Sequence, residues 1–196
     1  AGKGWGAYQP SQNLFEAYQV DEDGLPILDI DQREPLANDM GKVSSAEFIP
    51  TDHLLDPRVD WTIARRGIPY LDWGIHEGAS WIRSQYHGGP YMTLKYMHYK
   101  ANDGTMTASG GFKNSRNFRA YRYAHILLWR AEVAVEEEDF EKARTLINEV
   151  RARAQNEVVM GRCTTYQFDG RPVIVDYDQP AANYLVGLYP QDSEAF

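Results

Sequence analysis

Cysteine is nearly absent from this chain, which has Cys163 as its only thiol. A single cysteine excludes a disulfide framework within the chain and leaves its redox compartment open. Long apolar runs are also missing, because no stretch reaches the roughly 18 residues that a membrane-spanning helix needs. The 196 residues are 43% hydrophobic, which is enough for one good-sized domain with a core of its own.

Positive charge is scarce and dispersed. The chain has 20 Lys and Arg residues against 28 Asp and Glu residues, which gives a formal net charge of −8. The cations form no continuous block along the sequence. Because nucleic-acid binding depends on concentrated positive charge, we expect no nucleic-acid partner.

The motifs of common catalytic and metal sites are missing as well. The sequence contains neither the G-x-S-x-G turn of a serine nucleophile nor the G-x-x-x-x-G-K-[ST] phosphate loop. No two of its five histidines have the i, i+4 spacing of a helical zinc site. Acidic pairs such as Asp29 with Asp31 arise by chance in a chain this rich in carboxylates. We therefore predict no catalytic residue, no cofactor and no metal site.

The clearest regular pattern runs from residue 117 to residue 155. Apolar residues recur there at helical spacing with no Gly or Pro between them. Asp139 follows a run of three glutamates and is a good helix N-cap. The pattern predicts two antiparallel helices joined by a tight turn, with two apolar stripes: Tyr121, Ala124, Leu127, Leu128, Ala131, Ala134 and Val135, then Phe140, Ala143, Leu146, Ile147, Val150 and Ala154.

Small residues within this pattern favour a particular kind of helix pair. Ala131 and Ala143 lie twelve positions apart, which lets two helices approach closely as in a tetratricopeptide unit. An ordinary helical hairpin fits the same spacing. The chain contains no second copy at a period of 30 to 50 residues, although a lone repeat cannot bury its outer face. We therefore expect this chain to be part of something larger.

The rest of the chain is mostly irregular. Ser11 is the expected N-cap of one short helix, and Asp21 to Gly24 form a turn. Alternating residues predict a half-buried strand at 59–64 and a second strand at 91–100, and residues 173–175 are expected to form a further short strand. The predicted fold class is mainly α: a tetratricopeptide-like helix pair, part of an α-α superhelix, with long irregular loops and a few short strands.

Aromatic residues crowd the region before the helix pair: Trp61, Tyr70, Trp73, Trp81, Tyr86 and Tyr91. Large amphipathic rings often anchor irregular segments to a core. They also form flat platforms on which the apolar face of a sugar ring stacks, while Asn, Arg, Asp or Gln bond to its hydroxyl groups. Both interpretations remain open for each ring.

The helix-pair segments Arg122–Glu132 and Ala143–Ala154 resemble the signature pair of the RagB/SusD family of nutrient-binding lipoproteins. Further stretches resemble the C-terminal half of the same family, in order and over nearly the whole chain. They are Gly4–Gly6, Gln9–Leu14, Asp23–Ile27, Asp56–Thr62, Arg65–Gly74, Gly88–Tyr91 and Pro180–Tyr184.

The resemblance implies that residues 1–196 are a segment of a single SusD-like domain within a longer protein. Residues 1–116 would be a loop-rich ligand-side region with short strands, 117–155 the helix pair, and 156–196 a loop-rich tail. Our candidate ligand contacts are Trp73, Trp81 and Tyr70, supported by Asp72 and Arg83.

By the same resemblance the protein binds oligosaccharides, or in some members peptides, and delivers them to a SusC-like TonB-dependent transporter. It would sit on the outer membrane at the cell surface, held by a lipid anchor outside this chain. Two other functions stay open: a tetratricopeptide-type protein–protein interaction module, and an enzyme that acts on glycans.

Overall fold

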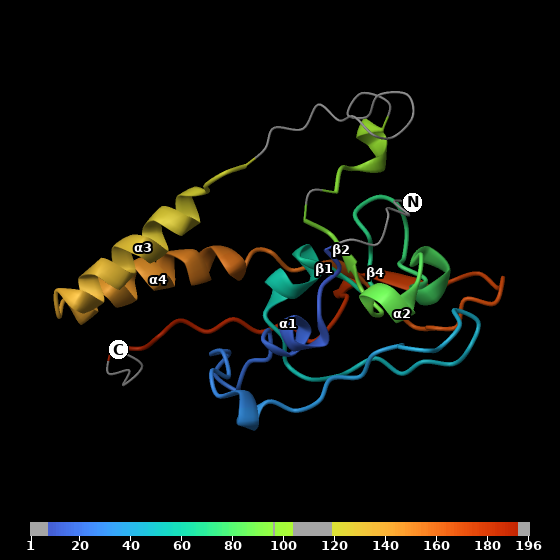
Figure 1. Ribbon diagram of the computed structural model, residues 1–196, viewed down its shortest axis with the longest axis horizontal. Helices are drawn as coiled ribbons and strands as arrows, with labels where there is room; N and C mark the ends of the chain where they lie inside the picture. Colours follow the sequence, from blue (N-terminus) through green and yellow to red (C-terminus); the bar gives the residue numbers. More distant parts are fainter. Residues whose placement is uncertain (1–7, 96, 104–118, 192–196) are drawn as a thin grey trace.

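The computed structural model describes residues 8–95, 97–103 and 119–191, most of them in irregular loops. Its α-helices are α1 (Gln12–Glu16), α2 (Gln85–Gly88), α3 (Tyr123–Glu136) and α4 (Phe140–Ala154). Its strands are β1 (Ile63–Ala64), β2 (Met92–Thr93), β3 (Met160–Cys163) and β4 (Val175–Pro180). Short 3₁₀ helices occur at η1 (Ile30–Gln32), η2 (Pro57–Trp61), η3 (Gly78–Trp81) and η4 (Lys100–Asn102). The α3–α4 pair projects from one side of a loop-rich part (Figure 1).

The predicted helix pair is confirmed. Ala131, Ala134 and Ala143 are almost completely buried, as expected where two helices approach closely. The buried stripe is narrower than the sequence pattern indicated, because Tyr121, Val135 and Phe140 are exposed. Leu127 is the one larger residue of α3 that is buried with the alanines, whereas the rings of Trp129 and Phe140 are more than 40% exposed.

The turn between α3 and α4 follows from two local devices. The backbone N–H of Glu138 donates to the carbonyl of Val135, and that of Asp139 donates to the carbonyl of Ala134 at 2.8 Å. These two bonds form a Schellman motif, which ends α3. Asp139 then begins α4 as predicted, because its carboxylate accepts from the backbone N–H of Lys142. Glu138 has φ +59°, a conformation that suits glycine.

The C-terminal segment lies along α4 (Figure 1) and is held by polar side chains rather than by a sheet. The side chains of Arg144, Asn148, Arg151 and Gln155, spaced three or four positions apart on one helix face, donate to backbone carbonyls between Val186 and Gln191. Arg151 also donates to the carbonyl of Gly24 at 2.6 Å. It therefore ties the helix, the tail and the N-terminal turn together.

The loop-rich part is stabilised by small apolar clusters and by buried arginines. One cluster joins α1, η2 and β1 through Phe15, Leu36, Leu55, Val59, Ile63 and Tyr91. Arg65 and Asp60 form a buried, two-bond ion pair at 2.7 Å, and the Tyr184 hydroxyl donates to the same carboxylate. Arg66 donates to the carbonyls of Ser44, Ala46 and Tyr166. These bonds replace the ladder bonds that a large sheet would provide.

All three strand predictions differ from the structure in their extent. Residues 57–61 form the 3₁₀ helix η2, because Pro57 occupies its first turn and the Asp56 carboxylate accepts from the N–H of Arg58. Val59 and Ile63 are both fully buried, as the alternation indicated, but Asp60 between them is buried as well and Trp61 is partly exposed. Of the described residues between 91 and 100, only Met92–Thr93 form a strand, antiparallel to β1. The strand expected at 173–175 begins at Val175 instead and pairs with β3. The short helix after Ser11 is confirmed as α1.

Replacing Glu138 by glycine tests the turn. We expect Glu138→Gly to raise the free energy of unfolding by about 0.5–1 kcal/mol, because glycine adopts the left-handed conformation without steric cost. Glu137 provides the matched control, since it has φ −81° at the end of the helix. Glu137→Gly should lower stability in the same urea-unfolding measurement. Equal effects of the two substitutions would contradict this account.

Candidate functional site

The predicted ligand contacts lie around one aromatic cluster in the loop-rich part. Tyr70 is at its centre and only 1% exposed, and its hydroxyl donates to the carbonyl of Thr93 at 3.3 Å. Burial raises the pKa of Tyr70 to about 12. Trp81 is partly exposed and packs edge-on against the Tyr70 ring with 5.8 Å between centroids. Tyr70 is therefore a support for the cluster, while Trp81 presents part of its surface to solvent.

A strained turn carries the next two predicted contacts. The N–H of Trp73 donates to the carbonyl of Tyr70, and Leu71 at the second turn position has φ +51°, where glycine is usual. Trp73 is half-buried, and its indole N–H donates to the carbonyl of His98 at 2.9 Å. Strained bulky residues of this kind often occur where a loop must present a side chain for function.

Asp72 is held at the tip of this turn. Its carboxylate accepts from the backbone N–H groups of Lys100 and Ala101 at 2.5 and 2.9 Å. Partial loss of hydration acts to raise the pKa of Asp72, but these two hydrogen bonds outweigh it and the pKa is lowered. Asp72 thus remains a charged acceptor. Arg83 is exposed two residues after η3.

The other aromatic residues of the region do not share this cluster. Tyr91 is buried, and its hydroxyl donates to Gln12 at 2.6 Å, so it acts as a core anchor. Tyr86 is 88% exposed and contacts the His87 ring. Trp61 lies elsewhere, in the wall of a cavity between the loop-rich part and the helix pair.

This cavity has a volume of about 810 Å³ and is open to solvent. Its walls come from η2, from residues 94–95 and 97–102, from the start of α3 and from the end of α4. Leu71 and His98 line it too, so it borders the aromatic cluster through the turn at residues 70–74. The indole N–H of Trp61 donates to the carbonyl of Glu157 at 2.6 Å, which fixes that ring in the wall.

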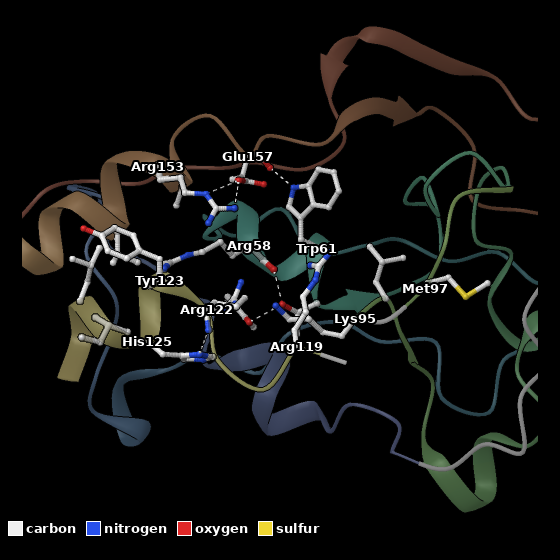
Figure 2. Close-up of a pocket in the computed structure, with 18 of the residues that line it drawn as sticks. Arg58, Trp61, Lys95, Met97, Arg119, Arg122, Tyr123, His125, Arg153 and Glu157 are labelled. Carbon is white, nitrogen blue, oxygen red and sulfur yellow. Dashed lines mark hydrogen bonds and ion pairs between the residues drawn. The ribbon is translucent and has the colours of Figure 1, made fainter. Parts of the chain in front are cut away.

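Of the residues that the structure describes, five cations line the cavity: Arg58, Lys95, Arg119, Arg122 and Arg153 (Figure 2). We name this space the cationic cavity. The sequence analysis missed it, because these residues come from four separate segments and form no block along the chain. The only local signal was the close spacing of Arg119 with Arg122, and nothing in the sequence places that pair near Lys95.

A comparison with known protein families identifies the family to which this chain belongs. The model of the SusD family matches residues 1–161, which include all of α3 and α4. The chain belongs to the SusD family. This confirms the resemblance that the sequence motifs indicated. A search of curated proteins gave no match to the SusD-family chain. Within the described ranges, none of its helices combines the length and apolar character that crossing a membrane requires.

A buried histidine makes the aromatic cluster sensitive to pH. His76 is fully buried between Tyr70 and Trp81, and its Nδ1 accepts from the N–H of Gly78 at 3.1 Å. Its Nε2 has no hydrogen-bond partner among the described residues. Burial lowers the pKa of His76 to about 3, so the folded protein keeps this ring neutral.

We expect the free energy of unfolding to fall as the pH drops from about 6.5 towards 3, by roughly 1 kcal/mol for each pH unit. The sign follows because the unfolded chain binds a proton at this histidine in that range and the folded chain does not. In His76→Asn, whose side-chain oxygen can replace Nδ1 as acceptor, this part of the decline should vanish. Urea unfolding at pH 7 and pH 5 measures it. His87→Asn, at an exposed position, should keep the decline.

Proposed function

We propose that this protein binds nutrient oligosaccharides at the cell surface and delivers them to a SusC-like TonB-dependent transporter of the outer membrane. Membership of the SusD family, over residues 1–161, is the observation that carries the proposal. The proposed mechanism is capture, closure over the transporter and release, without covalent chemistry. In this proposal a lipid anchor outside the chain holds the protein at the membrane, and the ligand of some members is a peptide.

The proposed sugar contacts are the exposed parts of Trp73 and Trp81, with Tyr70 as the buried support behind them. The position of the Trp81 ring supports this role, because its edge-on contact with Tyr70 and its tilted contact with His76 fix its orientation. A ring that is already ordered loses little entropy when a sugar stacks on it. Asp72 and Arg83 are the proposed partners for the hydroxyl groups.

The helix pair is the proposed end of a tetratricopeptide-like superhelix. Its outer surface carries Ile126, Trp129 and Val133, which are each more than 40% exposed and follow one helical face of α3. Exposed apolar stripes of this kind favour packing against further helices or a protein partner. The same stripe would serve a tetratricopeptide interaction module, so glycan binding is what separates the two functions.

Removing the Trp81 ring tests the proposed sugar contact. We expect Trp81→Ala to weaken binding of the native glycan by roughly tenfold or more, since loss of a tryptophan that is central to a binding site costs about 2 kcal/mol or more. A glycan array identifies the ligand, and calorimetry measures the change in Kd. Tyr86→Ala removes an exposed ring outside the cluster and should leave Kd unchanged.

The melting temperature of each variant accompanies this measurement. If Trp81→Ala unfolds the protein, Trp81→Phe keeps an aromatic anchor and should still bind more weakly than the native chain. Full affinity in a folded Trp81→Ala variant would exclude Trp81 as a ligand contact. A product assay on the same mixtures should show no turnover of the glycan, and turnover would favour the enzymatic alternative.

A further inference from the structure

The cationic cavity has an electrostatic character opposite to that of the whole chain. The chain carries a net charge of −8, whereas five cations and only two carboxylates, Glu149 and Glu157, line the cavity among the described residues. Its volume of about 810 Å³ lies within the roughly 300–1,000 Å³ of typical ligand pockets. The cavity is therefore large enough for several sugar rings and attracts negative charge locally.

Two of these cations are fixed by carboxylates of the protein. Arg58 donates two hydrogen bonds to Asp56, at 2.8 and 2.5 Å, and Arg153 donates to Glu157 at 3.0 Å. No ion pair joins Lys95, Arg119 or Arg122 to a carboxylate anywhere in the described part of the chain. These three side chains gather on one side of the cavity (Figure 2).

The lowered pKa of Lys95 also indicates that these cations lie close together. Removal of water by neighbouring atoms lowers it first, and the positive charges of Arg122, Arg153, Arg119 and Arg58 lower it further. Like charges held together destabilise a fold unless an anion joins them. A cluster of cations without carboxylate partners is typical of a binding site in which the ligand supplies the negative charge.

Aromatic rings complete the wall beside these cations. Trp61 is held by its bond to Glu157, and Tyr18 is held through its hydroxyl bond to Thr62 at 3.1 Å. Fixed rings provide stacking surfaces for sugar rings, and arginine forks match the geometry of carboxylate and sulfate groups. A long polyanion such as a nucleic acid does not suit a protein of net negative charge, so the features together favour a short acidic sugar.

We propose that the cationic cavity is a binding subsite for an oligosaccharide that carries anionic groups, with Lys95, Arg119 and Arg122 as its charge contacts and Trp61 as its stacking surface. This inference rests on the proposed glycan-binding function and narrows its substrate to acidic glycans. The cavity adjoins the aromatic cluster at Leu71 and His98, so one chain of sugars can reach both sites.

The experiment compares three oligosaccharides of equal length: a galacturonate tetrasaccharide, a chondroitin sulfate tetrasaccharide and neutral cellotetraose. We expect calorimetry to give a Kd for at least one acidic ligand that is roughly tenfold or more below that for cellotetraose, with an affinity that falls as salt is added. The first two ligands distinguish carboxylate from sulfate as the preferred group.

The double variant Lys95→Gln/Arg122→Gln changes two exposed cations of the cavity. We expect it to raise the Kd of the acidic ligand by roughly tenfold or more and to leave cellotetraose binding unchanged. The control Lys42→Gln/Arg130→Gln removes the same charge from exposed positions outside the cavity and should leave both unchanged. If the double variant is unstable, the single variant Arg119→Gln, at another exposed cation of the cavity, should still raise the Kd of the acidic ligand and leave cellotetraose binding unchanged.

Each contrary outcome points to a different failure. Equal affinity for acidic and neutral ligands, unaffected by the double variant, would overturn the inference and leave the proposed function intact. Binding of a hexaglutamate peptide more tightly than either acidic glycan, with loss in the same variant, would assign the cavity to an acidic peptide instead. Absence of binding to any glycan across a full array would overturn the proposed function itself.

Discussion

Buried arginines that bond to backbone carbonyls are the interaction on which this loop-rich fold depends. The two sheets among the described residues have only two strands each, so most loop carbonyls lack a ladder partner. Arg66 supplies that partner for residues 44, 46 and 166, and Arg151 supplies it for Gly24 and Gly187. A guanidinium presents five donors in a planar fork, against three on a lysine ammonium, and so can join several segments at once in a fixed geometry. The loops are consequently ordered without regular secondary structure.

The same network positions the candidate site. Arg65 and Arg66 directly precede the turn that leads to Tyr70, and the ion pair of Arg65 with Asp60 fixes the start of that segment. The aromatic cluster then orders Trp81 and Trp73 from behind. Charges that serve the fold are paired or bonded to carbonyls, whereas Lys95, Arg119 and Arg122 in the cationic cavity have no carboxylate within ion-pair distance among the described residues. That contrast separates structural cations from those available to a ligand.

Local patterns in the sequence predicted some features well and others poorly. The cap at Asp139, the cap at Ser11 and the close contact of Ala131 with the partner helix were all foreseen, because each depends on residues within a turn or two. Alternation at residues 59–63 was misleading, since Pro57 and the Asp56 cap favour a 3₁₀ turn there. The crowding of aromatic residues in the sequence pointed to the region of the aromatic cluster. It did not predict that Tyr70 is buried and that Trp81 is partly exposed.

The sequence by itself determined the helix pair and the family, because helical spacing, caps and short motifs are local properties that persist in any context. The tertiary structure alone decided which rings are exposed and where the cations meet. Lys95 comes close to Arg122 and Arg153 only because the tertiary fold places Lys95, the start of α3 and the end of α4 around one cavity. The positions of these residues in the sequence do not reveal that they meet, because the fold that brings them together depends on the burial of side chains from distant segments.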